Sequence, residues 1–281
     1  MSTVSTKIIS TRNHKKYKIN IETFKSAMEV VDSCNTRQIT DSCFNDMQHY
    51  PIDEWHGVKS YDEALDFLRN GYQPIVEQLK GLSKVKATGE TKRITFQNEV
   101  QGFFPVVPLA MMGIPNSMVN MTMKPIKCKV IDVYYDMTAE CNYTSEQIIK
   151  ANGKLIGAIT ELEKQGYKFN LYAVQGYAGD RDADMLAVKI KSSDKPIDLR
   201  RMSFPLCHTA FFRVIGFDWY SKFPKGKYRR GYGYSLTREF KSEFSEVGKQ
   251  VFGEHAVFIA CRKLLNDNSD KSIKEALICN M

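Results

Sequence analysis

The chain has 281 residues, with 40 Lys and Arg against 32 Asp and Glu, and a formal net charge of +8. Its hydrophobic content of 43% is ordinary for a globular protein and excludes disorder throughout. No apolar run approaches the roughly 18 residues of a membrane-spanning helix, and residues 1–7 lack the apolar stretch of a signal peptide. We therefore predict a cytoplasmic protein without membrane association.

The basic charge balance favours an anionic partner, either nucleic acid or an acidic protein surface. The 7 cysteines are scattered and include no C-x-x-C pair, so neither a zinc site nor a disulfide framework is indicated. They are typical of buried thiols in a reducing compartment.

Residues 1–126 are predicted to form a mainly helical region that packs against the rest of the chain. Its first part, residues 1–20, is polar and basic, which favours a flexible or loosely docked tail. Ser60 precedes two acids and an apolar repeat, the pattern of an N-capped amphipathic helix. Pro74 marks the start of a second helix.

Four prolines and five methionines crowd the segment 102–125. So many prolines predict an irregular segment rather than a long helix or strand. Methionine fills irregular gaps in a core, so the favoured interpretation is an apolar segment lying across the core. The alternative is an adaptable groove for a partner.

Residues 127–281 are predicted to form an α/β domain. Val130–Tyr135 is a short β-branched and aromatic run typical of a central strand. Thr144 and Gln147 then form the capping box of a helix that ends near Gly166. Further strands are expected at 169–174, 185–190 and 256–260, with a closing helix at 272–277. A crossover helix between the first two strands predicts that they are parallel.

The end of the first strand carries a candidate metal site. The string Asp136-Met137-Thr138-Ala139-Glu140 resembles the Asp-x-Ser-x-Ser motif of von Willebrand factor A-type domains. The resemblance implies that fold for residues 127–281, a Rossmann-like sheet with crossover helices. It also implies a Mg²⁺ or Ca²⁺ ion held by Asp136, Thr138, Glu140 and, from a later loop, Thr209.

Two departures from that motif predict a degenerate site without a cofactor. Glu140 is longer than the serine of the motif, and the strand before Arg262 ends without the aspartate that the family supplies. A metal-dependent enzyme or adhesion-type module using Asp136, Thr138 and Glu140 stays the alternative.

As a whole, the chain also resembles a set of uncharacterised bacteriophage proteins. The matching features are Tyr61-Asp62-Glu63-Ala64-Leu65, Gly71-Tyr72, Val100-Gln101-Gly102, Gly113-Ile114-Pro115 and Gly166-Tyr167. The resemblance implies a viral origin, and with it the host cytoplasm or the virion as location. It carries over no catalytic residue.

A basic segment interleaved with aromatic residues follows Trp219. Cations can neutralise phosphates while exposed rings stack on bases, so we predict a nucleic-acid contact here. The alternative is a loop that folds back onto the sheet and meets an acidic surface of a neighbouring subunit. The candidate contact residues are Lys222, Lys225, Lys227, Tyr228, Arg229, Arg230, Tyr232, Tyr234 and Arg238.

No catalytic residue is assigned. Cys207 and His208 are adjacent in the sequence, whereas a nucleophile and its base normally come from separate parts of the chain. We therefore expect a non-catalytic binding or structural protein, with a homo-oligomer or a virion component as open possibilities.

Overall fold

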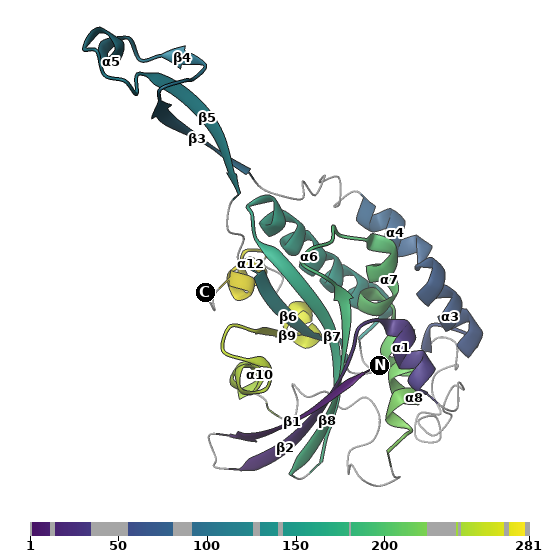
Figure 1. Ribbon diagram of the computed structural model, residues 1–281. Coiled ribbons are helices and arrows are strands. Elements are labelled where there is room, and N and C mark those ends of the chain that lie inside the picture. The colour runs from purple at the N-terminus through teal and green to yellow at the C-terminus, as the bar shows by residue number, and fades with distance from the viewer. Residues whose placement is uncertain are drawn as a thin grey trace.

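A mixed sheet of six strands, in the order β1-β2-β8-β7-β6-β9, forms the body of the molecule (Figure 1). The computed structural model describes residues 2–11, 15–34, 56–80, 92–125, 130–139, 143–179, 181–223, 240, 243–266 and 270–278. The strands of the body are β1 (Thr3–Ser10), β2 (Lys16–Phe24), β6 (Val130–Asp136), β7 (Lys168–Ala178), β8 (Asp182–Lys191) and β9 (Val257–Ala260).

Strand directions divide this sheet into two halves. In one half, β6 is parallel to both β7 and β9. In the other half, β8 is parallel to β2, and the two halves join where β7 runs antiparallel to β8. The carboxyl ends of β6, β7 and β9 therefore lie at one end of the sheet, and those of β2 and β8 lie at the opposite end.

Each face of the sheet is covered by its own core. On β6, Ile131, Val133 and Tyr135 point to one face, while Tyr134 packs on the other. The first face is covered by α1 (Ala27–Ser33), α3 (Tyr61–Asn70), α6 (Ser145–Lys164), α7 (Leu199–Cys207), the π-helix η2 (Phe211–Ile215), α8 (Gly216–Tyr220), α11 (Cys261–Asn266) and α12 (Asp270–Ile278). The second face is covered by α10 (Phe244–Phe252).

The α/β class and several predicted elements are confirmed. The strand expected at Val130–Tyr135 is β6, and it lies inside the sheet between β7 and β9. Thr144 caps α6, with both bonds of the capping box to Gln147 present. Ser60 caps α3, and α4 (Gln73–Lys80) begins just before Pro74.

The prediction of a loosely docked N-terminal tail and a mainly helical first region was wrong. β1 and β2 are full members of the body sheet, with eight residues of each in register. Tyr17, Ile19 and Ile21 are buried and alternate with exposed lysines and a half-buried asparagine, the period of two of a half-buried strand. The basic residues between them masked this alternation.

Residues 92–125 form a separate unit, here called the arm, which projects from the body (Figure 1). It holds a small sheet in the order β3-β5-β4 and a short helix. The elements are β3 (Lys92–Glu99), β4 (Phe104–Pro105), α5 (Val107–Met111) and β5 (Met118–Pro125). The predicted irregular segment across the core was therefore wrong. The prolines lie in β4, in the first turn of α5, in a turn and at the last residue of β5, where they permit regular structure.

Candidate functional site

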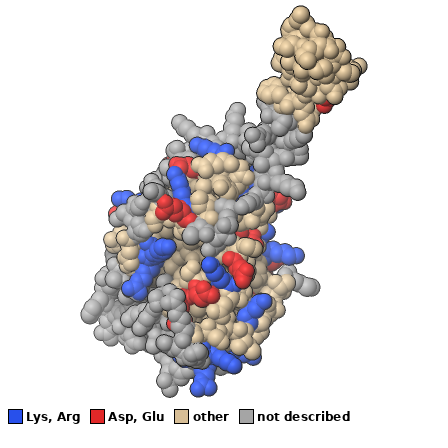
Figure 2. All heavy atoms as spheres, turned by 90° about the vertical axis from the view of Figure 1, so that its left-hand side faces the viewer, with Lys and Arg blue, Asp and Glu red and all other residues tan. Residues whose placement is uncertain are grey.

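The arm exposes large apolar side chains to solvent. Met111 is 84% exposed, Met112 73% and Phe103 69%, and the only charged residue between Phe96 and Met123 is Glu99. Figure 2 accordingly shows the outer part of the arm almost wholly in tan. A contiguous apolar surface on a projecting element is typical of a protein-interaction site. The other exposed apolar residues of the arm are Phe96, Val100, Phe104, Val107, Ile114 and Met121.

A second exposed apolar surface lies on β1, one of the two outer strands of the body sheet. Val4 and Ile8 are 69% and 76% exposed, and they share one face because they are four residues apart in a strand. Among the described residues β1 pairs with β2 alone. We call this strand, with Val4 and Ile8, the β1 edge. It lies at the end of the body away from the arm (Figure 1).

A cavity of about 390 Å³ opens beyond the carboxyl ends of β2 and β8. Segments distant in sequence meet there: the start of α1, the end of α3, the end of β8 with its following turn, and α7. Six Lys and Arg residues and no Asp or Glu line this basic cavity. They are Lys25, Arg69, Lys189, Lys191, Lys195 and Arg201.

The predicted metal ligands are only partly brought together. Asp136 and Thr138 are both buried, and Asp136 Oδ1 accepts bonds from the Thr138 backbone N–H (3.1 Å) and hydroxyl (2.5 Å). Thr209 instead donates its hydroxyl to the His56 carbonyl oxygen at 3.3 Å. Glu140 lies outside the described residues. Across the described ranges, no three His, Cys, Asp or Glu side chains gather in a metal-binding cluster.

Cys207 and His208 end α7 in a buried environment. Burial raises the pKa of the Cys207 thiol well above its usual range, which favours the neutral thiol. Burial lowers the pKa of His208 to about 4, and its Nδ1 accepts the Ala210 N–H at 3.1 Å. The imidazole is therefore engaged with the backbone that follows it.

A buried amide joins three elements of the body. The Tyr135 hydroxyl donates to Asn152 Oδ1, and Asn152 Nδ2 donates to the Leu206 carbonyl oxygen. Asn152 is 1% exposed. This network connects β6, α6 and α7, and Tyr135 directly precedes the candidate metal residue Asp136.

Of the predicted nucleic-acid contacts, the structure describes Lys222. Its Nζ donates to Ser33 Oγ at 2.6 Å and lies 5.9 Å from the centre of the Phe24 ring. It is thereby held at the end of α1. Lys225, Lys227, Tyr228, Arg229, Arg230, Tyr232, Tyr234 and Arg238 lie outside the described residues, so this contact stays a prediction.

Sequence reasoning missed the basic cavity and the β1 edge. The cavity draws on residues from 25 to 205, and only Lys189, Lys191 and Lys195, at and after the end of a strand, gave a local signal. For the arm, the sequence signal was the run of methionines and prolines. It was compatible with an apolar segment across the core or with an adaptable groove for a partner.

The fold and these surfaces define a mixed α/β protein with a projecting apolar arm and a basic cavity. No described helix is long and apolar enough to cross a membrane. The chain belongs to a family described as a domain of unknown function, DUF7192, whose model matches residues 6–275. Comparisons with curated proteins and with solved structures found no match.

Proposed function

We propose that the protein is a non-catalytic structural component that assembles head to tail, with the arm of one copy docked on the β1 edge of the next. The observation that carries this proposal is the exposed apolar surface of the arm. Leaving side chains such as Met111 and Met112 in water is unfavourable, and burying them against another apolar surface relieves that cost.

The second copy is the partner that best matches the arm. β3 is an outer strand of the arm sheet, and β1 is an outer strand of the body sheet. Each is eight residues long. Pairing them would add main-chain hydrogen bonds to the apolar contact, as in β-strand addition. The two surfaces lie at different ends of one molecule, so the contact is heterologous and extends into a ring or a filament. The resemblance to bacteriophage proteins suggests a virion as the setting.

Light scattering during size-exclusion chromatography tests this assembly. We expect the mass of the wild-type protein to rise with concentration above that of the 32.2 kDa chain. Met111→Glu/Met112→Glu in the arm, or Val4→Lys/Ile8→Lys on β1, should give monomers. Val130→Glu is the control, because Val130 is a 55% exposed apolar residue at the start of β6 and belongs neither to the arm nor to the β1 edge.

Mixing the two monomeric variants distinguishes head-to-tail assembly from other modes. The arm variant keeps an intact β1 edge and the β1 variant keeps an intact arm, so one interface forms and a dimer appears. A wild-type protein that stays monomeric, or a mixture that stays monomeric, contradicts the proposal.

We also propose that the body is a von Willebrand A-like domain with a degenerate metal site. The order β8-β7-β6-β9 and the helix α6 between parallel β6 and β7 support this. The added β2 and β1 beyond β8 are a departure from the short antiparallel edge that the resemblance implies. Calorimetry with Mg²⁺, Ca²⁺ and Mn²⁺ tests the site. Binding at millimolar concentration or tighter that Asp136→Ala abolishes would favour the metal-dependent alternative.

A further inference from the structure

The position of the basic cavity is that of a ligand site in an α/β sheet. Ligands in such sheets bind outside the carboxyl ends of parallel strands, and β2 and β8 are a parallel pair. Lys25, directly after β2, and Lys191, the last residue of β8, both line the cavity. The volume of about 390 Å³ is within the range of about 300 to 1,000 Å³ that is usual for small-molecule sites. The candidate metal residues lie at the other end of the sheet, so this is a different site.

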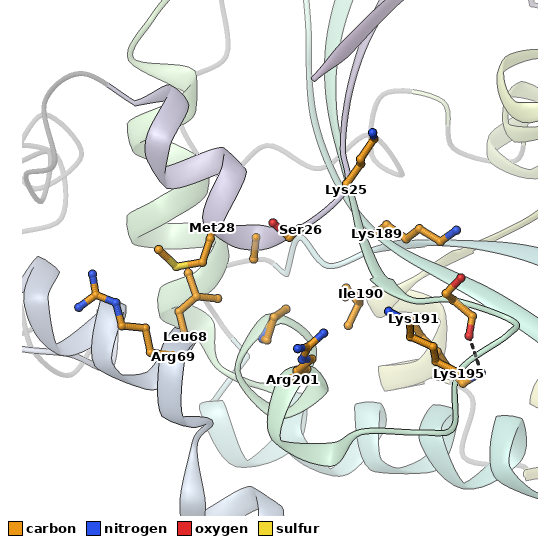
Figure 3. Close-up of a pocket in the computed structure, with 13 residues that line it drawn as sticks. Lys25, Ser26, Met28, Leu68, Arg69, Lys189, Ile190, Lys191, Lys195 and Arg201 are labelled. Carbon is orange, nitrogen blue, oxygen red and sulfur yellow. Dashed lines mark hydrogen bonds between the residues drawn. The ribbon is translucent and has the colours of Figure 1, made fainter. Parts of the chain in front are cut away.

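Two of the six cations that line the cavity already have a partner in the body. The Lys191 ammonium is paired with Glu163, whose Oε1 lies 2.5 Å from its Nζ, and the Lys191 side chain is buried. Lys189 lies with its Nζ 5.7 Å from the centre of the Tyr172 ring and points away from the hollow (Figure 3). The remaining four are Lys25, Arg69, Lys195 and Arg201.

Nearby acids reduce this positive charge only in part. Arg201 Nε lies 3.6 Å from Asp198 Oδ2, but both side chains are more than half exposed, and such surface pairs are weak. Glu29 accepts the Lys25 backbone N–H at 3.0 Å, which lowers the pKa of its carboxyl. A hydrogen bond from Ser192 lowers the pKa of Asp194. None of these acids lines the cavity itself.

The floor of the cavity is apolar. Ala27, Met28, Leu68, Ile190 and Pro205 line it together with the hydroxyl-bearing Ser26 and Ser192. In Figure 3, Met28 and Leu68 lie beside each other, with Arg201 on one side of them and Arg69 on the other side, its guanidinium directed away from Arg201. The lining therefore combines several cations with apolar side chains.

We propose that this cavity binds a nucleotide, with the phosphate held by the cationic rim and the base lying on the apolar floor. Arginine pairs with phosphate through two parallel hydrogen bonds, and several cations suit a phosphate better than a singly charged carboxylate. A bare phosphate would leave the floor unused. The site is independent of the proposed assembly, because it contains no residue of the arm or of β1.

Isothermal titration calorimetry with AMP, inorganic phosphate and a single-stranded oligothymidylate tests this site. We expect AMP to bind more tightly than inorganic phosphate. Arg201→Glu should weaken AMP binding about tenfold or more, since a charge-assisted hydrogen bond is lost and repulsion is added. Arg201 is exposed, so the substitution leaves the fold intact.

Arg181→Glu is the matched control, because Arg181 is an exposed arginine just before the opposite end of β8 and changes the net charge equally. Met28→Ser should weaken the binding of AMP and leave that of inorganic phosphate unchanged. Tighter binding of oligothymidylate than AMP assigns the site to nucleic acid, and the reverse order assigns it to a free nucleotide.

Three results would overturn the proposal: no binding of any of the three probes, equal weakening by Arg201→Glu and Arg181→Glu, or inorganic phosphate binding as tightly as AMP. The Met111→Glu/Met112→Glu variant should bind AMP as the wild type does. Failure of the assembly and failure of the nucleotide site are therefore distinguishable.

Discussion

The buried amide of Asn152 is the side chain on which β6, α6 and α7 converge. Asn152→Leu keeps the branched shape of the side chain but removes the hydrogen bonds to the Tyr135 hydroxyl and to the Leu206 carbonyl oxygen. Unsatisfied buried polar groups cost about 1 to 3 kcal/mol each, so we expect a loss of that order in the free energy of unfolding, measured with urea. Adding Tyr135→Phe should remove one of these penalties. The double variant should then lose less than the sum of the two single losses, and strict additivity would contradict the network.

His208 should make the stability of the protein depend on pH. Its pKa is about 4 in the folded protein, because burial disfavours the charged imidazolium, and about 6.5 when unfolded. The unfolded chain therefore binds the proton first as the pH falls. The contribution of neutral His208 to the free energy of unfolding should be complete above pH 6.5. It should decrease between pH 6.5 and pH 4 by up to about 1.4 kcal/mol per pH unit.

Urea unfolding at several pH values measures this effect. His208→Asn can still accept the Ala210 N–H and should lose that part of the pH dependence. The exposed His255→Asn serves as the control and should keep it. An unchanged profile in His208→Asn would show that other groups cause the decline.

At the scale of elements, the arm depends on a glycine. A Cβ at Gly102 would lie 2.3 Å from the Val119 carbonyl oxygen, which accepts the Phe103 N–H at 2.8 Å. The atoms nearest to this Cβ belong to the backbone of Val119 and Asn120, which cannot rotate away as a side chain could. Gly102→Ala should therefore separate β4 from β5. Hydrogen exchange should accelerate at Phe103 and Val106 while the amides of the body keep their protection.

Gly157→Ala in α6 is the matched control. No atom lies within 4 Å of its added Cβ, so alanine should stabilise the helix by about 0.5 to 1 kcal/mol. Exchange in the arm should be unchanged in this variant. Equal effects of the two substitutions on the arm would contradict the close contact at Gly102.

Elements that are specified by a short sequence motif could be predicted from the sequence. The capping box at Thr144 and the apolar run at Val130–Tyr135 each specify their structure over a few residues, and both appear as expected. The arm could not be predicted in this way, because exposed apolar residues contradict the rule that such residues are buried. The basic cavity depends on the meeting of Lys25, Arg69 and Arg201, which only the tertiary fold brings about.

For the whole molecule, the body should be independent of the arm. Neither core of the body contains a described residue of 92–125. Replacing these residues with a short Gly/Ser linker should therefore leave the far-UV signal of the body sheet and the urea midpoint of the monomer nearly unchanged. A marked loss of stability in the shortened chain would show that the arm supports the body.

The uncharged surface of the arm also sets how its contacts respond to conditions. Burial of apolar surface lowers the heat capacity, and the stabilisation that it provides weakens on cooling. Salt, in contrast, screens interactions between charges. Assemblies formed through the arm should thus dissociate on cooling and persist at high ionic strength. A phosphate ligand in the basic cavity should instead dissociate at high ionic strength. Temperature and ionic strength would then act as separate controls on two different sites of one molecule.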